Sequence, residues 1–170
     1  WCLGNEMDGP WQIGHKTADE YGRLAAEVAR AMRRIDPGLE LIASGSSNSE
    51  MPTFGAWEST MLEHCYDLVD HVSVHAYYAQ HGDDRASFLA SAVDMDHIIE
   101  RVAATADAVG ARLRNGKRLR LAFDEWNVWY YQRFDESHLG YERRGPVEGQ
   151  PAALIEDTYS AVDAVVVGSL

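Results

Sequence analysis

Segments with the hydrophobic period of a strand and segments with the hydrophobic period of a helix alternate along the chain. Residues 71–77 alternate with a period of two, so that Val72, Val74 and Ala76 share one face of a predicted strand. Residues 17–35 open with a capping-box sequence and carry apolar residues three and four apart, which is typical of an amphipathic helix. Strands and helices that alternate in this way predict an α/β fold with a parallel sheet.

The same two patterns continue along the whole chain. Strands are predicted at the N-terminus and over residues 39–44, 71–77 and 119–125, and helices over residues 17–35, 54–68, 85–114 and 151–166. These elements make up several consecutive strand–helix units, whereas a closed (β/α)8 barrel needs about 250 residues. We therefore expect residues 1–170 to form part of a (β/α)8 barrel, about half of one, and to be a fragment of a longer protein.

Charge and cysteine content exclude several functional classes. The formal net charge is −12 and the basic residues form no stripe, so we expect no nucleic-acid partner and no membrane partner. No run approaches the ~20 apolar residues that a transmembrane helix needs. Cys2 and Cys65 have neither metal-binding nor redox-motif spacing, and we expect two buried thiols.

Two glutamates each follow an apolar run that predicts a strand. Glu6 follows residues 1–5, and Glu125 follows residues 119–124. A carboxylate at the C-terminal end of a buried strand costs desolvation energy and does little for packing. Cleavage of a glycosidic bond needs at least two such carboxylates, here on the rim of one barrel.

Glu6 has an amide before it and an aromatic side chain after it. Asn5 is its neighbour, and Trp11 is expected to supply an apolar wall. A carboxyl group against an aromatic surface is disfavoured as an anion, so we expect a raised pKa and a proton held at neutral pH, as a general acid requires. The alternative is a capping or salt-bridged carboxylate in a loop.

Glu125 and Asp124 are both candidates for the second catalytic carboxylate. Strand alternation places Glu125 on the face of Phe123 and turns Asp124 toward the helices, so we assign the inward position to Glu125. An ion pair with a nearby arginine is the alternative. Four aromatic residues that could stack on sugar rings follow the strand: Trp126, Trp129, Tyr130 and Tyr131.

His71 and His75 share a strand face but lie about 13 Å apart by strand rise, and no ligand cluster accompanies them. We therefore expect no metal site. His75 is instead a candidate hydrogen-bonding group at the site.

Three segments of the chain resemble glycoside hydrolase family 51, the α-L-arabinofuranosidases within a large clan of (β/α)8 barrels. They are WCLGNEMDGPWQ over residues 1–12, VHAYY over residues 74–78 and FDEWNVWY over residues 123–130. The resemblance covers essentially the whole chain in segment order and spacing.

This resemblance implies that Glu6 is the acid/base at the end of the fourth barrel strand and that Glu125 is the nucleophile at the end of the seventh. Four further residues would bind or position the sugar: Asn5 at the 2-hydroxyl, Tyr77 at the nucleophile, Trp129 in the arabinofuranosyl subsite and His75 as a further polar group. The chain would then hold roughly strands 4 to 7, without the other strands or the family's C-terminal β-sandwich.

The implied activity is the retaining, exo-acting release of terminal α-L-arabinofuranosyl residues from oligo- or polysaccharides, with no cofactor and no metal. We expect the fragment to be inactive by itself. Two alternatives stay open: another retaining barrel glycosidase, such as an endoglucanase or xylosidase, and a non-catalytic sugar-binding barrel. The expected partner is a carbohydrate substrate, the expected location is the cytoplasm rather than the cell exterior, and a homo-oligomer of the complete enzyme is left open.

Overall fold

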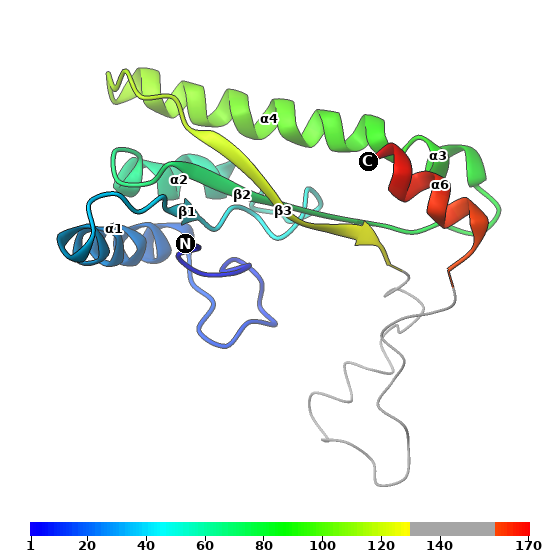
Figure 1. The fold of residues 1–170 in the computed structure, drawn as a ribbon, viewed down its shortest axis with the longest axis horizontal. Coiled ribbons are helices and arrows are strands. Elements are labelled where there is room, and N and C mark those ends of the chain that lie inside the picture. The colour runs from blue at the N-terminus through cyan, green and yellow to red at the C-terminus, as the bar shows by residue number, and fades with distance from the viewer. Residues whose placement is uncertain (130–158) are drawn as a thin grey trace, which may run out of the picture. The chain divides into compact units, whose positions relative to one another are not determined.

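The structure is a computed structural model that describes residues 1–129 and 159–170. These residues fall into two compact units. The first unit holds Trp1–Ala76 and Met95–Trp126, and the second holds Tyr77–Asp94 and the described part of Asn127–Leu170. The elements in chain order are α1 (Ala18–Ile35), β1 (Ile42–Ala43), α2 (Ala56–Cys65), β2 (His71–Tyr78), α3 (Arg85–Leu89), α4 (Ser91–Arg112), β3 (Arg120–Val128) and α6 (Ala161–Ser169) (Figure 1).

The strands form a sheet in the order β1-β2-β3. β1 and β2 are parallel, with Ile42 opposite His71. An isolated parallel bridge joins Cys2 to Ile42, so the strand predicted at the N-terminus is reduced to this bridge. The predicted strands over 39–44, 71–77 and 119–125 are confirmed in place, the first of them much shortened. The fold is α/β with a parallel sheet, as the sequence predicts.

Gly45 is needed where the chain leaves β1. A Cβ atom at this position would lie 2.2 Å from the backbone oxygen of Ser73 in β2. Since a main-chain oxygen of a strand cannot move aside cheaply, only glycine lets the segment after β1 run this close to β2.

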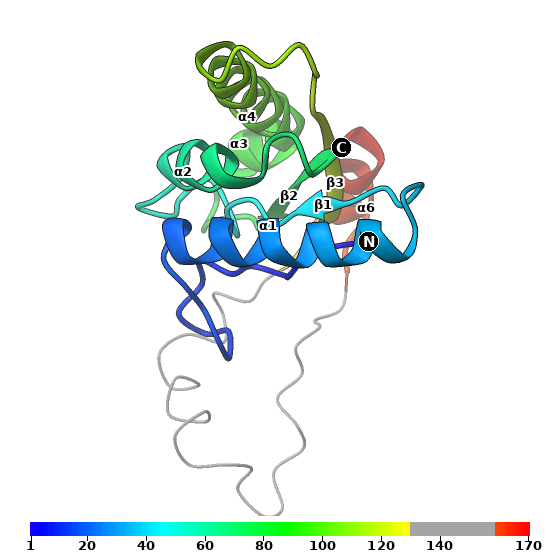
Figure 2. The ribbon, with the colours of Figure 1, turned by 90° about the vertical axis from the view of Figure 1, so that its left-hand side faces the viewer.

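α1 and α2 pack side by side in the first unit (Figure 2). α1 begins with the predicted capping box, in which Glu20 and Thr17 cap each other. The apolar spacing of residues 17–35 predicts a stripe of Tyr21, Leu24, Val28, Met32 and Ile35. Of these, Tyr21 is buried, but Leu24, Val28 and Ile35 are exposed. The rest of the buried face consists of Gly22, Ala25, Ala26 and Ala29. Small residues let the two helices approach closely, so the largest apolar side chains of α1 do not mark its buried face.

The helix predicted over residues 85–114 is two helices. α3 begins after Asp84, whose side chain accepts a hydrogen bond from the backbone of Ser87, and ends at Ala90. α4 then restarts at Ser91, so the predicted single inward face is only partly right. The sequence pattern predicts that Leu89, Ala92, Ile99, Val102, Ala106 and Val109 face inward. Val102, Ala106 and Val109 are buried, but Leu89 and Ile99 are exposed, and Met95 and Ile98 are buried in their place.

The second unit has its own small core. Phe88 of α3, Val128 of β3 and Val166 of α6 are buried together, with Tyr78 and Val162 packed against them. α6 begins at Ser160 with a capping box. The helix predicted over 151–166 is therefore wrong at residues 159 and 160, which are not helical, and right from Ala161 on, while residues 151–158 lie outside the described residues.

Asp70 joins three segments of the first unit at the beginning of β2. Its carboxylate accepts hydrogen bonds from the backbone N–H of Leu41 at 2.9 Å, from Arg33 of α1 at 2.7 Å and from Lys117 at 3.1 Å. Partial burial raises the pKa of Asp70, but these three donors lower it by more than burial raises it. The pKa of Asp70 therefore lies below its ordinary value. This carboxylate ties α1 and the segments before β1 and β3 to one end of the sheet.

Within the described residues, no helix combines the length and the apolar character needed to cross a bilayer.

Candidate active site

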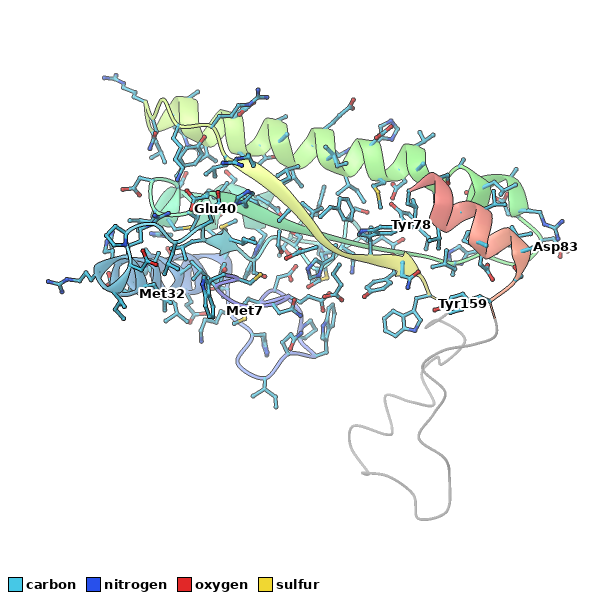
Figure 3. The ribbon with its side chains drawn as sticks, in the orientation of Figure 1. Met7, Met32, Glu40, Tyr78, Asp83 and Tyr159 are labelled. Carbon is cyan, nitrogen blue, oxygen red and sulfur yellow. The ribbon has the colours of Figure 1, made fainter. Side chains whose placement is uncertain are left out.

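Glu6 lies on the loop that follows the Cys2 bridge, next to Met7, which Figure 3 labels. Its backbone φ is 47°, a left-handed conformation that residues other than glycine seldom adopt. The preceding Gly4 also has a positive φ, of 134°, and a Cβ there would lie 2.8 Å from the side chain of Met7. Strained backbone of this kind gathers at functional sites, and the sequence pattern did not predict it.

The loop that carries Glu6 is fixed to the loop after β1. The carboxylate of Asp8 accepts hydrogen bonds from the backbone N–H of Ser47, at 3.1 Å, and from the Ser47 hydroxyl. The backbone N–H of Met7 lies 3.5 Å from the hydroxyl oxygen of Ser44. Asp8 carries no recognisable role in the sequence, because an Asp in a polar loop gives no signal of its distant partner.

The carboxylate of Glu6 is largely buried, with 14% of its side chain exposed, and accepts two well-formed hydrogen bonds. Trp11 Nε1 donates to Oε2 at 2.8 Å, and His75 Nδ1 lies 3.1 Å from Oε1. Burial raises the pKa of Glu6, but the bonds from His75, Trp11 and Gln12 together outweigh it and hold the pKa below its ordinary value. The prediction of a raised pKa is therefore wrong for the chain without substrate. The main reason is the hydrogen bond from His75, and Trp11 adds to it because it presents its polar N–H rather than an apolar wall.

His75 stands at the centre of the site. Its side chain is 3% exposed, on β2. Nδ1 lies 3.1 Å from Glu6 and 3.6 Å from Oε2 of Glu125, and Nε2 lies 3.4 Å from Oδ1 of Asp124. Burial lowers the pKa of His75, but the bond to Glu6 and the charges of Glu125, Asp124 and Glu6 raise it more, so its pKa lies above the ordinary value. The raised pKa favours the protonated ring, and three carboxylates surround it.

The two glutamates singled out in the sequence come together at this histidine. One ligand atom from each of Glu6, His75 and Glu125 lies within 4.8 Å of the other two. Glu125 is more open to solvent than Glu6, with 36% of its side chain exposed. The spacing matches two carboxylates that can act on the same bond.

The predicted orientation of Asp124 is wrong. It was expected to face the helices, yet it lies against the ring edge of His75 opposite to the glutamates, with 32% of its side chain exposed. An imidazole has nitrogens on two edges, so a single ring on β2 can contact consecutive residues of the neighbouring strand. Simple strand alternation does not anticipate such a bridging ring.

By spacing alone, Glu6, His75 and Glu125 could hold a metal ion. A metal would need the lone pair of His75 Nδ1, which a protonated ring does not offer. The raised pKa of His75 thus favours a proton at this position. The absence of a metal and of a cofactor stays a prediction.

The remaining predicted residues are distributed over both units. Asn5 is exposed beside Glu6 in the first unit. Tyr77 and Trp129 pack edge to face within the second unit, with ring centroids 4.9 Å apart. Trp126 is 40% exposed, as a stacking surface would be, while Tyr130 and Tyr131 lie outside the described residues. The roles assigned to these side chains stay predictions.

The two cysteines differ from each other. Cys65 is buried as predicted, and burial raises its pKa to about 12. Cys2 is exposed, contrary to prediction, and its Sγ lies 3.6 Å from Asp124. Its backbone pairs with Ile42 of β1 through the isolated parallel bridge.

Comparison with known proteins places this site in context. No protein-family model matches the chain. An "intracellular exo-α-(1→5)-L-arabinofuranosidase" of Streptomyces lividans is 59% identical over 172 residues, which cover 100% of this chain and 25% of that protein. An "exo-α-(1→6)-L-arabinofuranosidase" of Bifidobacterium longum is 53% identical over 175 residues, which cover 100% of this chain and 33% of that protein.

A solved structure of a family 51 α-L-arabinofuranosidase from Bifidobacterium longum superposes with a TM-score of 0.87 at 42% identity. The match covers 99% of this chain and 35% of that structure. The chain therefore spans about a quarter to a third of the length of the curated relatives it matches.

Proposed function

We propose that the chain is part of the catalytic domain of a glycoside hydrolase family 51 enzyme and that the complete protein is a retaining α-L-arabinofuranosidase. The observation that carries this proposal is the approach of Glu6 and Glu125 to one nitrogen of His75, with carboxylate oxygens within 4.8 Å of each other. Retaining glycosidases need their two carboxyl groups about 5 Å apart, whereas inverting enzymes leave room for a water between them.

In the proposed reaction Glu6 is the acid/base and Glu125 the nucleophile. Glu6 gives a proton to the leaving oxygen while Glu125 attacks the anomeric carbon. Water, activated by the Glu6 carboxylate, then hydrolyses the covalent arabinosyl–Glu125 intermediate, and the anomeric configuration is retained.

Glu6 must hold a proton when the first step begins. A sugar that enters beside Glu6 excludes water from the carboxylate and so raises its pKa, against the hydrogen bonds from Trp11 and His75. His75 supports both stages, because its Nδ1 faces both glutamates and can donate to whichever of them is charged.

The proposal extends to the fold and the substrate. We assign the chain to roughly strands 4 to 7 of a (β/α)8 barrel, with Asn5 and Trp129 as sugar-binding residues and Tyr77 as the residue that orients Glu125. The substrates are carbohydrates with terminal α-L-arabinofuranosyl groups. The names of the two relatives divide between (1→5) and (1→6) linkages, so we propose the sugar and not the linkage. The name of the Streptomyces protein supports a cytoplasmic location.

One experiment tests the reaction and its stereochemistry together. The complete protein that carries these residues is given an aryl α-L-arabinofuranoside, and NMR follows the anomer that forms first. We expect the α-anomer, and much slower turnover of aryl β-D-xylosides and β-D-glucosides. A first-formed β-anomer would exclude the retaining mechanism, a preference for another glycoside would favour the alternative glycosidases, and binding without turnover would favour the non-catalytic barrel.

A further inference from the structure

Asp124 has no part in the two-glutamate mechanism, yet it contacts the residue on which both glutamates converge. Its Oδ1 lies 3.4 Å from Nε2 of His75. Its other oxygen, Oδ2, lies 3.6 Å from the thiol of Cys2. Two separate segments, β2 and the N-terminal segment, thus contact this carboxylate.

The ring of His75 therefore has acceptors at both ends. Glu6 and Glu125 face Nδ1, and Asp124 faces Nε2. A neutral imidazole has one N–H, so one of its two edges would present a lone pair to a carboxylate. Only the doubly protonated ring donates on both sides, and donation on both sides also fixes the rotation of the ring.

We propose that Asp124 is a positioning residue, which holds the His75 ring protonated and oriented so that its Nδ1–H reaches the two catalytic glutamates. This inference rests on the proposed function for its catalytic consequence. Its structural part, the state and orientation of His75, is independent of the substrate.

The charges around His75 all favour the same protonation state. The facing groups in the first unit are Glu6 from the N-terminal loop and Asp124 and Glu125 from β3. Each of them raises the pKa of His75 against the effect of burial. Burial and the charge of Asp124 raise the pKa of Cys2, so its thiol stays a neutral neighbour. Loss of the Asp124 charge should therefore lower the pKa of His75.

The direct test is the titration of His75 in the complete protein, followed by NMR with labelled histidine. The His75 signal is identified by its loss in His75→Gln. In the wild type we expect the ring to be more than half protonated at pH 6.5, the ordinary pKa of histidine. In Asp124→Asn the midpoint should move to lower pH, and in Asp124→Glu it should return toward the wild-type value.

Kinetics with an aryl α-L-arabinofuranoside supply the second measurement. Asp124→Asn should lower kcat about 10- to 100-fold with little change in KM, because misplaced catalytic groups cost this much. The matched control is Cys2→Ala, which removes the other neighbour of Asp124 and should change neither the His75 titration nor kcat. Recovery of kcat in Asp124→Glu would show that the loss in Asp124→Asn comes from the missing carboxylate and not from a folding defect.

Several outcomes would overturn the inference. They are a wild-type His75 that is mostly neutral at pH 6.5, an Asp124→Asn protein with an unchanged midpoint, and a lowered midpoint with unchanged kcat. If Asp124→Asn does not fold, the titration of His75 in the wild type still tests whether the ring is protonated. If the wild type hydrolyses no arabinofuranoside, the proposed function fails, while the NMR result still reports on Asp124.

Discussion

The indole N–H of Trp11 donates a 2.8 Å hydrogen bond to Oε2 of Glu6, the residue proposed as the acid/base. Trp11 lies on the same loop as Glu6 and is 47% exposed. A hydrogen bond donated to the carboxylate stabilises its charged form, so Trp11 opposes the protonated state that a general acid needs. Through this hydrogen bond, Trp11 lowers the pKa of Glu6 and so affects the pH range in which the enzyme is active.

Trp11→Phe should move the alkaline limb of the kcat/KM profile to higher pH. The variant keeps an aromatic ring but removes the donor, so the pKa of Glu6 rises, and the alkaline limb reports the loss of its proton. The measurement is kcat/KM against pH in the complete protein. Trp126→Phe, a partly exposed tryptophan of the same unit, serves as the control and should leave the limb in place. A shift to lower pH in Trp11→Phe would contradict the assignment of Glu6.

Alanine variants of the two glutamates should differ in their response to azide. Glu6→Ala should still form the glycosyl-enzyme from a substrate whose leaving group needs no proton, and azide should restore its turnover, because no base is needed to activate azide. Glu125→Ala cannot form the intermediate and should show no such turnover with the α-substrate. Rates with activated and unactivated aryl arabinofuranosides, with and without azide, distinguish the two roles. Equal behaviour of the two variants would remove the basis of the assignment.

The sequence predicts the parallel α/β fold and the meeting of Glu6, His75 and Glu125, because both follow from local pattern. The period of residues 71–77 fixes the strand that carries His75, and each glutamate directly follows an apolar run. Strands in a parallel sheet bring their C-terminal ends to one edge, so these residues could be placed near each other without knowledge of packing. The predicted position of Glu125 at a strand end is wrong, however, because β3 continues to Val128 and Glu125 lies within it.

The predictions that failed depend on partners distant in sequence. The pKa of Glu6 depends on the hydrogen bonds from His75 and from the N–H edge of Trp11, and the contact of Asp124 depends on a ring from another strand. The buried face of α1 depends on how closely α2 approaches, which favours Ala25 and Ala29 over Leu24. Periodicity describes one element at a time and contains none of this information.

Gly45→Ala should destabilise the first unit. The added Cβ would meet the backbone oxygen of Ser73 at 2.2 Å, so β1 and β2 must move apart. Overpacking of this kind costs about 1–3 kcal/mol. We expect a lower thermal midpoint for the complete protein. Gly116→Ala is the matched control, because an added Cβ there meets no atom within 4 Å, and it should leave the midpoint nearly unchanged.

Asp70→Asn should destabilise the protein at neutral pH but not in acid. The pKa of Asp70 in the folded chain lies below its ordinary value of 3.8, since the donors of Leu41, Lys117 and Arg33 outweigh the effect of burial. A carboxyl group with a lowered pKa stabilises the fold above its unfolded pKa, and this stabilisation is lost as pH falls through the folded pKa. The partly exposed carboxylate loses charge-assisted hydrogen bonds in the variant, which we expect to cost about 1–2 kcal/mol at pH 7 after solvent screening. Urea unfolding of wild type and variant as a function of pH measures this difference, and it should shrink as the wild-type carboxylate becomes protonated. A difference that stays constant down to low pH would show that Asp70 acts through packing rather than through its charge.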